Sequence, residues 1–254
     1  LKLALCTPNN LIVWQELGKH NRIFHGLASK FWYGIVAKIG FKKALIVARS
    51  VQAREFISKY CKNVSDTIID HGVNIEKFTP CREKDNQFAI SSQLISRKHI
   101  EKSIEAFAKY LNKYDDSAKL YIMGDGDEKE NLRKLAKDLG ADKNIIFTGK
   151  LGHNELIEIL KKSIAMLVYT EKDNNMVSIV ESIALATPVI TTDIPYNASY
   201  IKAEKLGIVN NNWNEDDLRK LATSDEYINN CINYRKYLPT EYKAEQFLKV
   251  KGLI

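Results

Sequence analysis

The chain has 254 residues, 45% of them hydrophobic and 27% charged, which is typical of a globular protein with one large domain or two ordinary ones. No apolar run reaches the roughly 18–20 residues of a membrane-spanning helix, because lysines interrupt the longest candidate, residues 31–48. The formal net charge of +7 lies entirely in residues 1–75, where eleven lysines and arginines outnumber four acids. This uneven charge indicates that the first third of the chain contacts something anionic.

The four cysteines, Cys6, Cys61, Cys81 and Cys231, are widely separated and form no CxxC pair. That spacing argues against a zinc site and against a disulfide framework, and it favours a reducing cytoplasm. The chain begins at Leu1 rather than at methionine, so we expect an N-terminal portion to precede it.

The first third alternates short apolar runs with basic helical stretches. The patterns predict strands at 3–5, 11–14, 44–47 and 64–69 and helices at 23–39 and 50–60. Aromatic side chains interleave with lysines in residues 19–43, which is consistent with a packed helix that has a solvated edge. The second interpretation is peripheral binding to anionic lipid, since an interfacial helix has the same pattern. No groove-reading or base-stacking module is recognisable, so we expect no nucleic acid partner.

From residue 88 onward, apolar strands and amphipathic helices alternate in a pattern that predicts an α/β sheet. Asn154 is the expected N-cap of the helix predicted at 155–163. His153, which precedes Asn154, has no evident partner. Strands are predicted at 88–91, 119–123, 145–148, 166–169 and 189–192, and helices at 100–110, 129–139, 155–163, 177–186, 215–222, 227–237 and 241–253.

One stretch, residues 167–192, combines a strand, a loop, a helix and a second strand around two carboxylates. Asp173 lies in the loop, and Glu181 follows eight residues later, about one turn into the helix. A helix that begins at the carboxyl end of a parallel strand presents backbone N–H groups that favour phosphate. Either carboxylate could accept hydrogen bonds from sugar or ribose hydroxyls beside that phosphate. The alternative is an ordinary βαβ unit without a ligand.

This stretch resembles the acidic-x7-acidic signature of the large family of retaining glycosyltransferases known as glycosyl transferases group 1, which uses nucleotide-sugar donors. The family's signature helix and following strand are similar to ESIALATPVITT, at 181–192. The family's crossing between domains resembles HGVNIEKFTP, at 71–80, and the end of its N-terminal domain resembles ALIVARSVQAREFISKY, at 44–60. The resemblance covers about residues 44–210.

The resemblance implies the α/β GT-B architecture, with two Rossmann-like, doubly wound parallel-sheet domains, the first of them incomplete in this chain. The family's glycine-rich acceptor loop has no counterpart here. The implied divisions are the end of the N-terminal, acceptor-side domain at 1–75, an interdomain linker at 76–86, the nucleotide-sugar donor domain at 87–240, and a terminal helix at 241–254 that crosses back to the first domain.

The resemblance also implies roles for single residues. Glu181 would bind the donor ribose, and Asp173, where the family has glutamate, would contact the donor sugar. Lys98 would neutralise the donor diphosphate, while Gln93 replaces the family's arginine and Arg97 is the nearest compensating charge. The catalytic candidates are therefore Lys98 and Asp173, and the donor-binding candidates are Gln93, Arg97, Gly124, Lys150, Leu151, Asn174, Asn175, Met176, Val177, Ser178 and Glu181.

The implied reaction is transfer of a sugar from a nucleoside diphosphate sugar to an acceptor hydroxyl, with retention of anomeric configuration and without a metal or cofactor. The implied acceptor is a carbohydrate or lipid-linked molecule of surface polysaccharide or glycolipid biosynthesis. The protein would then be cytoplasmic, with a peripheral position on the inner face of the cytoplasmic membrane through residues 19–43 as an option.

Two alternatives stay open at this point. A non-catalytic homologue that binds nucleotide sugar as a subunit would explain Gln93 and Asp173. It would also explain Asn174, Asn175 and Met176, which replace the family's Gly-Phe-Gly loop between the two acidic positions. A nucleotide-sugar epimerase of the same architecture should lack the ribose-binding acid, so Glu181 argues against it.

Overall fold

A computed structural model describes residues 2–6, 35, 39, 41 and 44–252. The chain forms two compact units, one drawn from Leu1–Gly72 and Thr240–Ile254 and the other from Val73–Pro239. The predicted strand at 11–14 and, apart from residues 35, 39 and 41, the predicted helix at 23–39 and the basic segment 19–43 lie outside the described residues. Among the helices that are described, none has the length and apolar character needed to span a membrane.

The first unit is built on a three-stranded parallel sheet in the order β1-β2-β3. Its small core contains Ala44, Ile46 and Ile57, because the apolar central strand packs against α4. Ser50 caps that helix by accepting a hydrogen bond from the Ala53 N–H at 3.0 Å. The elements are β1 (Lys2–Cys6), β2 (Ala44–Ala48), α4 (Val51–Ser58), β3 (Val64–Ile68) and α12 (Thr240–Lys251).

An ion pair joins α12 to the chain that follows β3 within the first unit. Lys243 Nζ lies 2.6 Å from Asp70 Oδ1, and both side chains are almost fully buried. Gly72 also approaches the helix closely, because a Cβ there would lie 2.8 Å from the Thr240 Cα. The last helix of the chain therefore completes the unit that the first residues begin.

The second unit is an α/β sandwich around a six-stranded sheet in the order β6-β5-β4-β7-β8-β9. Every strand pair is parallel. This is the doubly wound order in which the chain moves outward through three strands, returns to the middle and moves outward again. The strands are β4 (Gln87–Ser91), β5 (Lys119–Met123), β6 (Ile145–Gly149), β7 (Ala165–Leu167), β8 (Val189–Thr191) and β9 (Gly207–Val209).

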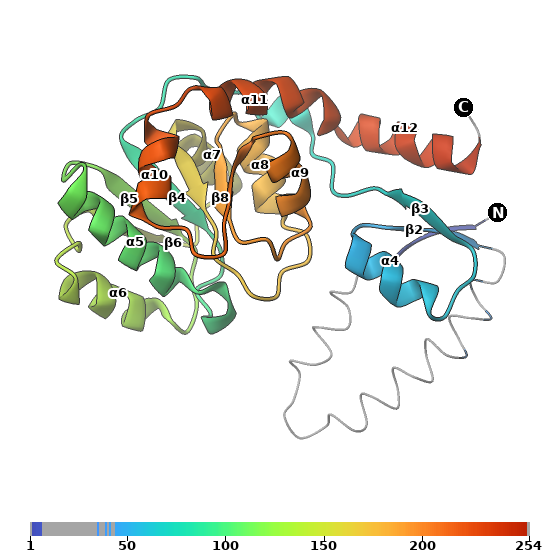
Figure 1. Cartoon of the computed structure of the whole chain (residues 1–254), viewed down its shortest axis with the longest axis horizontal. Coiled ribbons are helices and arrows are strands. Elements are labelled where there is room, and N and C mark those ends of the chain that lie inside the picture. The colour runs from blue at the N-terminus through green and yellow to red at the C-terminus, as the bar shows by residue number, and fades with distance from the viewer. Residues whose placement is uncertain (1, 7–34, 36–38, 40, 42–43, 253–254) are drawn as a thin grey trace. The chain divides into compact units, whose positions relative to one another are not determined.

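Helices cover both faces of this sheet (Figure 1) and give the unit two cores. In β4, Phe88 and Ile90 enter the core beneath one set of helices, and Ala89 enters the other. The central strands β4, β7 and β8 are buried on both faces, and they are accordingly rich in apolar residues, whereas the edge strands β6 and β9 are mostly half-buried. The first face carries α5 (Ile100–Lys113), α6 (Lys129–Asp138) and α10 (Glu215–Ala222), and the second carries α7 (His153–Lys162), α8 (Val177–Ala184), α9 (Asn197–Ala203) and α11 (Glu226–Tyr234).

Two details of the sequence prediction are corrected by the structure. Helix α7 begins at His153, so its N-cap is Gly152 rather than Asn154, and Glu155 accepts a hydrogen bond from the Gly152 N–H at 3.0 Å. Strand β9 was not predicted, because its first residue is a glycine that reads as the end of a helix. Gly207 has φ 155°, and a Cβ there would lie 1.9 Å from the Val189 carbonyl oxygen of the neighbouring strand.

Residues 76–86, expected as a linker, belong to the second unit in the structure. Phe78 is buried in its second core, and the Cys81 N–H donates to the Leu185 carbonyl at 3.2 Å. The 3₁₀ turn η2 (Ile75–Lys77) precedes Phe78.

The order of strands fixes where a ligand site can form. Successive connections run to opposite sides of the sheet from β4 and β7, which are neighbours in its middle. The loops that follow these two strands therefore diverge and leave a crevice at the carboxyl edge of the sheet. Residues 92–99 and 168–176 form those two loops.

Candidate functional site

The loops after β4 and β7 meet through a cluster of charged side chains centred on Asp173. Lys98 Nζ lies 2.6 Å from Asp173 Oδ2, and Arg97 Nη1 lies 3.2 Å from Oδ1. The Thr170 hydroxyl donates a hydrogen bond to Oδ2 at 2.5 Å. The two basic side chains, although adjacent in sequence, therefore reach the same carboxylate. With two cations and one anion, the cluster has a net positive charge that favours an anionic ligand.

Backbone geometry explains why both cations reach Asp173. They lie on the 3₁₀ turn η3 (Ser96–Lys98), and His99 ends that turn in the left-handed conformation, with φ 41°. Helix α5 starts immediately afterwards. This abrupt change of direction turns the loop back toward the carboxyl end of β7.

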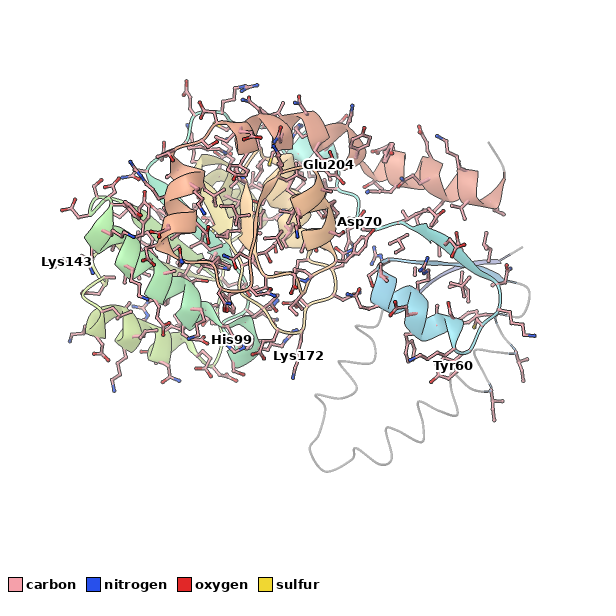
Figure 2. All side chains as sticks on the ribbon, viewed as in Figure 1. Tyr60, Asp70, His99, Lys143, Lys172 and Glu204 are labelled. Carbon is pink, nitrogen blue, oxygen red and sulfur yellow. The ribbon has the colours of Figure 1, made fainter. Side chains whose placement is uncertain are left out.

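His99, labelled in Figure 2, makes a second connection between the two loops. Its Nδ1 lies 2.8 Å from Glu101 Oε1, and its Nε2 lies 2.9 Å from Glu171 Oε1. Burial opposes the charged ring, but the contacts with Glu101 and Glu171 outweigh burial and raise the pKa of His99 above its ordinary value. The sequence prediction missed His99, whose only signal was its position directly after Lys98.

The start of α8 is open to an anion. Its N-cap residue, Met176, provides no side-chain cap, and no acidic residue lies in the first turn. Val177, the first helical residue, is 41% exposed. The N–H groups of Val177 and Ser178, with the helix dipole behind them, are the kind of group that binds phosphate.

Asn197, on α9, fixes the loop that leads into α8. Its Oδ1 accepts a hydrogen bond from the Met176 N–H at 2.7 Å, and its Nδ2 contacts the Tyr200 hydroxyl at 2.6 Å. Asn197 is fully buried. Sequence reasoning did not find this residue, because it lies 21 positions from Met176 and outside the signature stretch.

The two asparagines of the signature loop are both buried. Asn174 is only 8% exposed, yet neither its Nδ2 nor its Oδ1 has a hydrogen-bond partner among the described residues. Its backbone carbonyl accepts a hydrogen bond from the Tyr196 N–H at 2.6 Å, so the position of the loop is fixed. Buried amides are nearly always paired, so this one is a candidate to pair with a polar group of a ligand.

The second acidic residue of the signature, Glu181, has a partner that the sequence did not reveal. His153 Nε2 lies 3.0 Å from Glu181 Oε1, although the two residues are 28 positions apart. Glu181 is 15% exposed and His153 is 52% exposed. No contact joins this pair directly to Asp173 within the described part of the chain.

The loop after β5 packs against the loop after β4 and is hydrogen-bonded to the end of β6. Gly124, with φ 154°, packs so closely that a Cβ would lie 1.8 Å from the Ser92 carbonyl oxygen. The Gly124 N–H donates to the Gly149 carbonyl at 2.9 Å, and the Leu94 N–H donates to the Asp125 carbonyl at 3.0 Å. The three loops are thereby connected through their backbones.

The remaining predicted residues lie at the periphery of this arrangement. Gln93 and Lys150 are exposed, and neither contacts the Asp173 cluster through its side chain in the ranges that the structure describes. Leu151 is half-buried and packs against the second core of the unit.

The chain resembles known proteins in sequence. Residues 74–236 match the family model described as Glycosyl transferases group 1. The alpha-monoglucosyldiacylglycerol synthase of Streptococcus pneumoniae is 28% identical over 178 residues, which cover 64% of this chain and 40% of that protein. The O-antigen chain mannosyltransferase RfbU of Salmonella typhimurium is 28% identical over 171 residues, which cover 65% and 47%. The chain thus spans less than half the length of these relatives.

Solved structures share its fold. WaaG, a glycosyltransferase involved in lipopolysaccharide biosynthesis, matches with a TM-score of 0.71 at 18% identity over 99% of this chain and 75% of that chain. HepE of Anabaena, in complex with UDP and glucose, matches with a TM-score of 0.68 at 13% identity over 86% and 66%. At these identities the likeness shows the fold alone. It confirms the predicted α/β architecture of the GT-B type.

Proposed function

Because the chain belongs to the glycosyl transferases group 1 family, we propose that it transfers a sugar from a nucleoside diphosphate sugar to an acceptor hydroxyl. The observation that carries the proposal is the convergence of Lys98 and Arg97 on Asp173, where the strand order of the doubly wound sheet reverses. Ligands of such sheets bind at that crevice.

The positive charges match the hardest step of the reaction. The bond between the sugar C1 and the diphosphate oxygen breaks, and its electron pair leaves with the diphosphate. The acceptor oxygen forms the new bond to C1, and the proton of the acceptor hydroxyl passes to the departing diphosphate. Lys98, Arg97 and the N–H groups at the start of α8 are the groups that would stabilise the leaving diphosphate. One such donor is typically worth about 3–4 kcal/mol in the transition state. Arg97 supplies the charge that Gln93 lacks.

The two carboxylates suit the two sugars of the donor. Asp173 would accept hydrogen bonds from hydroxyls of the transferred sugar, and Asn174 would offer that sugar a buried donor and acceptor. Glu181 would accept hydrogen bonds from the ribose. The transfer would retain anomeric configuration by attack on the same face of the sugar, without a metal and without a protein nucleophile.

The acceptor is proposed from the relatives. The printed names of two of them refer to a glucosyldiacylglycerol and to an O-antigen chain. We therefore propose a carbohydrate or lipid-linked acceptor of surface polysaccharide or glycolipid biosynthesis, bound at the cytoplasmic face of a membrane. The excess positive charge of residues 1–75 supports contact with anionic lipid, and no part of the proposal involves nucleic acid.

One observation favours a second candidate, a subunit that binds nucleotide sugar without transferring it. Asp173 already contacts Lys98, Arg97 and Thr170, and Gln93 contributes no charge. Such a protein would bind the donor and leave it intact.

The test is a calorimetric titration of the chain with UDP, GDP and ADP, repeated on Lys98→Ala and Glu181→Ala. Lys143→Ala is the matched control. This lysine is exposed and lies just before β6, at the amino ends of the strands, whereas the site lies at their carboxyl ends. We expect one nucleotide to bind the parent and the control with micromolar affinity and both site variants at least tenfold more weakly.

Release of the nucleoside diphosphate from its UDP, GDP or ADP sugar then separates the enzyme from the silent subunit. Failure of all three nucleotides to bind would overturn both candidates.

A further inference from the structure

His153 contacts the signature carboxylate Glu181 from another element of the fold. It is the first residue of α7, directly after the loop that follows β6, whereas Glu181 lies on α8. Their contact, between His153 Nε2 and Glu181 Oε1, is 3.0 Å long. Within the described residues no other side-chain hydrogen bond or ion pair of Glu181 is found.

The imidazole of His153 also contacts an aromatic ring. The ring of Phe78 contacts it edge to face, with ring centroids 5.9 Å apart and an interplanar angle of 75°. Phe78 is buried in the second core of the unit, so it is a fixed support. The backbone beneath the ring is also fixed, because Glu155 accepts the Gly152 N–H at the start of the same helix.

We propose that His153 is a positioning residue for the donor ribose. Nε2 donates a hydrogen bond to Oε1 of Glu181, which orients the carboxylate so that Oε2 accepts hydrogen bonds from the ribose hydroxyls. A glutamate has three rotatable bonds, and fixing them before the nucleotide arrives reduces the entropy lost on binding. This inference rests on the proposed function, because it takes Glu181 as the group that binds the ribose.

The proposal has a consequence for specificity. A carboxylate held by His153 favours a nucleotide that carries both ribose hydroxyls over one that lacks the 2′-hydroxyl. Without the 2′-hydroxyl, Oε2 of Glu181 lacks one of its hydrogen-bond donors. A histidine that only packed on Phe78 would not change this preference.

The experiment measures calorimetric affinities for UDP and 2′-deoxy-UDP, with GDP or ADP and their 2′-deoxy forms if UDP does not bind. It compares the full chain with His153→Ala and His153→Gln. The glutamine amide reaches the position of Nε2 and can donate to Oε1, whereas alanine cannot. Asn154→Ala is the matched control, because Asn154 is exposed on the same turn of α7. Thermal unfolding of each variant verifies that it is folded.

We expect His153→Ala to bind the ribonucleotide about fivefold more weakly and to lose most of its preference over the deoxynucleotide. In His153→Gln and Asn154→Ala, the affinity for the ribonucleotide and the preference over the deoxynucleotide should both stay within about twofold of the parent values. In a Glu181→Ala background, His153→Ala should have no further effect.

Three results would overturn the proposal. His153→Ala could lose as much affinity for the deoxynucleotide as for the ribonucleotide, His153→Ala and His153→Gln could lose the same affinity, or the affinities of His153→Ala could equal those of the parent. If the parent chain binds none of the nucleotides, the proposed function itself fails, and the inference fails with it.

Discussion

Lys98 Nζ and Asp173 Oδ2 lie 2.6 Å apart, so the cation proposed for the donor diphosphate is paired with the carboxylate proposed for the donor sugar. The side chains are 12% and 13% exposed, and solvent therefore screens the pair only weakly. Arg97 and Thr170 complete the same cluster. These groups act as a unit, and the effects of changing them should not be additive.

Different changes in nucleotide affinity are expected when the two members of this pair are altered. Asp173→Asn removes the anion that competes for Lys98, so UDP should bind as tightly as before or more tightly. Lys98→Ala removes the cation and should weaken UDP binding at least tenfold, because a charge-assisted hydrogen bond is lost. Calorimetry with UDP measures both. Lys102→Ala, an exposed lysine paired with Glu105 on α5, is the control. An equal loss of UDP affinity in Asp173→Asn and Lys98→Ala would contradict this prediction.

Asn174 and Asn197 are both buried asparagines, but they should differ in their contribution to stability. Asn174→Ala should change the free energy of unfolding by less than about 1 kcal/mol, because its amide has no partner in the described structure to lose. Asn197→Ala leaves the buried Met176 N–H without its acceptor and should destabilise the protein by about 1–3 kcal/mol. Urea unfolding gives both values.

The same Asn174→Ala variant should bind UDP normally and UDP-glucose more weakly than the parent. A loss of UDP affinity as large as the loss for UDP-glucose would mean that Asn174 does not contact the sugar.

Gly124 and Gly149 both have positive φ, yet only Gly124 has no room for a side chain. A Cβ at Gly124 would overlap the Ser92 carbonyl oxygen at 1.8 Å, and no atom lies within 4 Å of a Cβ at Gly149. Gly124→Ala should therefore destabilise the protein by more than about 3 kcal/mol. Gly149→Ala should cost only about 1–2 kcal/mol of backbone strain. Denaturant midpoints that are equal for the two variants would show that the β4 and β5 loops separate easily.

His99 should make stability depend on pH in one direction. Its pKa is raised in the folded protein, so the folded state binds its proton more tightly than the unfolded chain does. The contribution of His99 to the free energy of unfolding is fully present below the ordinary histidine pKa of about 6.5. It is lost as the pH rises through the raised pKa of His99 in the folded protein.

His99→Asn is the appropriate variant for this test, because asparagine tolerates the left-handed backbone at this position. The free energy of unfolding of the parent minus that of the variant should decrease from pH 6 to pH 8.5. Glu171→Gln, which removes one of the two carboxylates that contact the ring, should reduce that slope. A difference that is independent of pH would show that neither acid affects the imidazole.

Much of the secondary structure of the second unit was predictable because helices cover both faces of its sheet and bury its central strands. The continuous apolar run of β5 and the amphipathic pattern of α10 gave those elements the bounds that the structure has, Lys119–Met123 and Glu215–Ala222. Local signals were insufficient where tertiary contact decides the conformation. Gly207 continues into β9 only because Val189 lies beside it.

The residues of the candidate site followed from the resemblance to the family, but the contacts between them did not. Whether Arg97 and Lys98 point the same way depends on η3 and on the left-handed His99, which no residue pattern indicated. The partners of Glu181 and Met176, which are His153 and Asn197, come from other helices and have no fixed spacing from the signature. Such contacts follow from the packing of loops, and sequence periodicity does not encode them.

The first unit takes its strands from the beginning of the chain and its last helix from the end, with the whole second unit between them. Asp70 therefore leaves the ribosome 173 residues before Lys243, the lysine that pairs with it. Within the second unit, the Val73 N–H donates to the Leu238 carbonyl at 2.9 Å, and this hydrogen bond joins the two ends of that unit. During synthesis Lys98, Asp173 and Glu181 therefore all emerge before Lys243, so the side chains of the candidate site are present before the ion pair of the first unit can form.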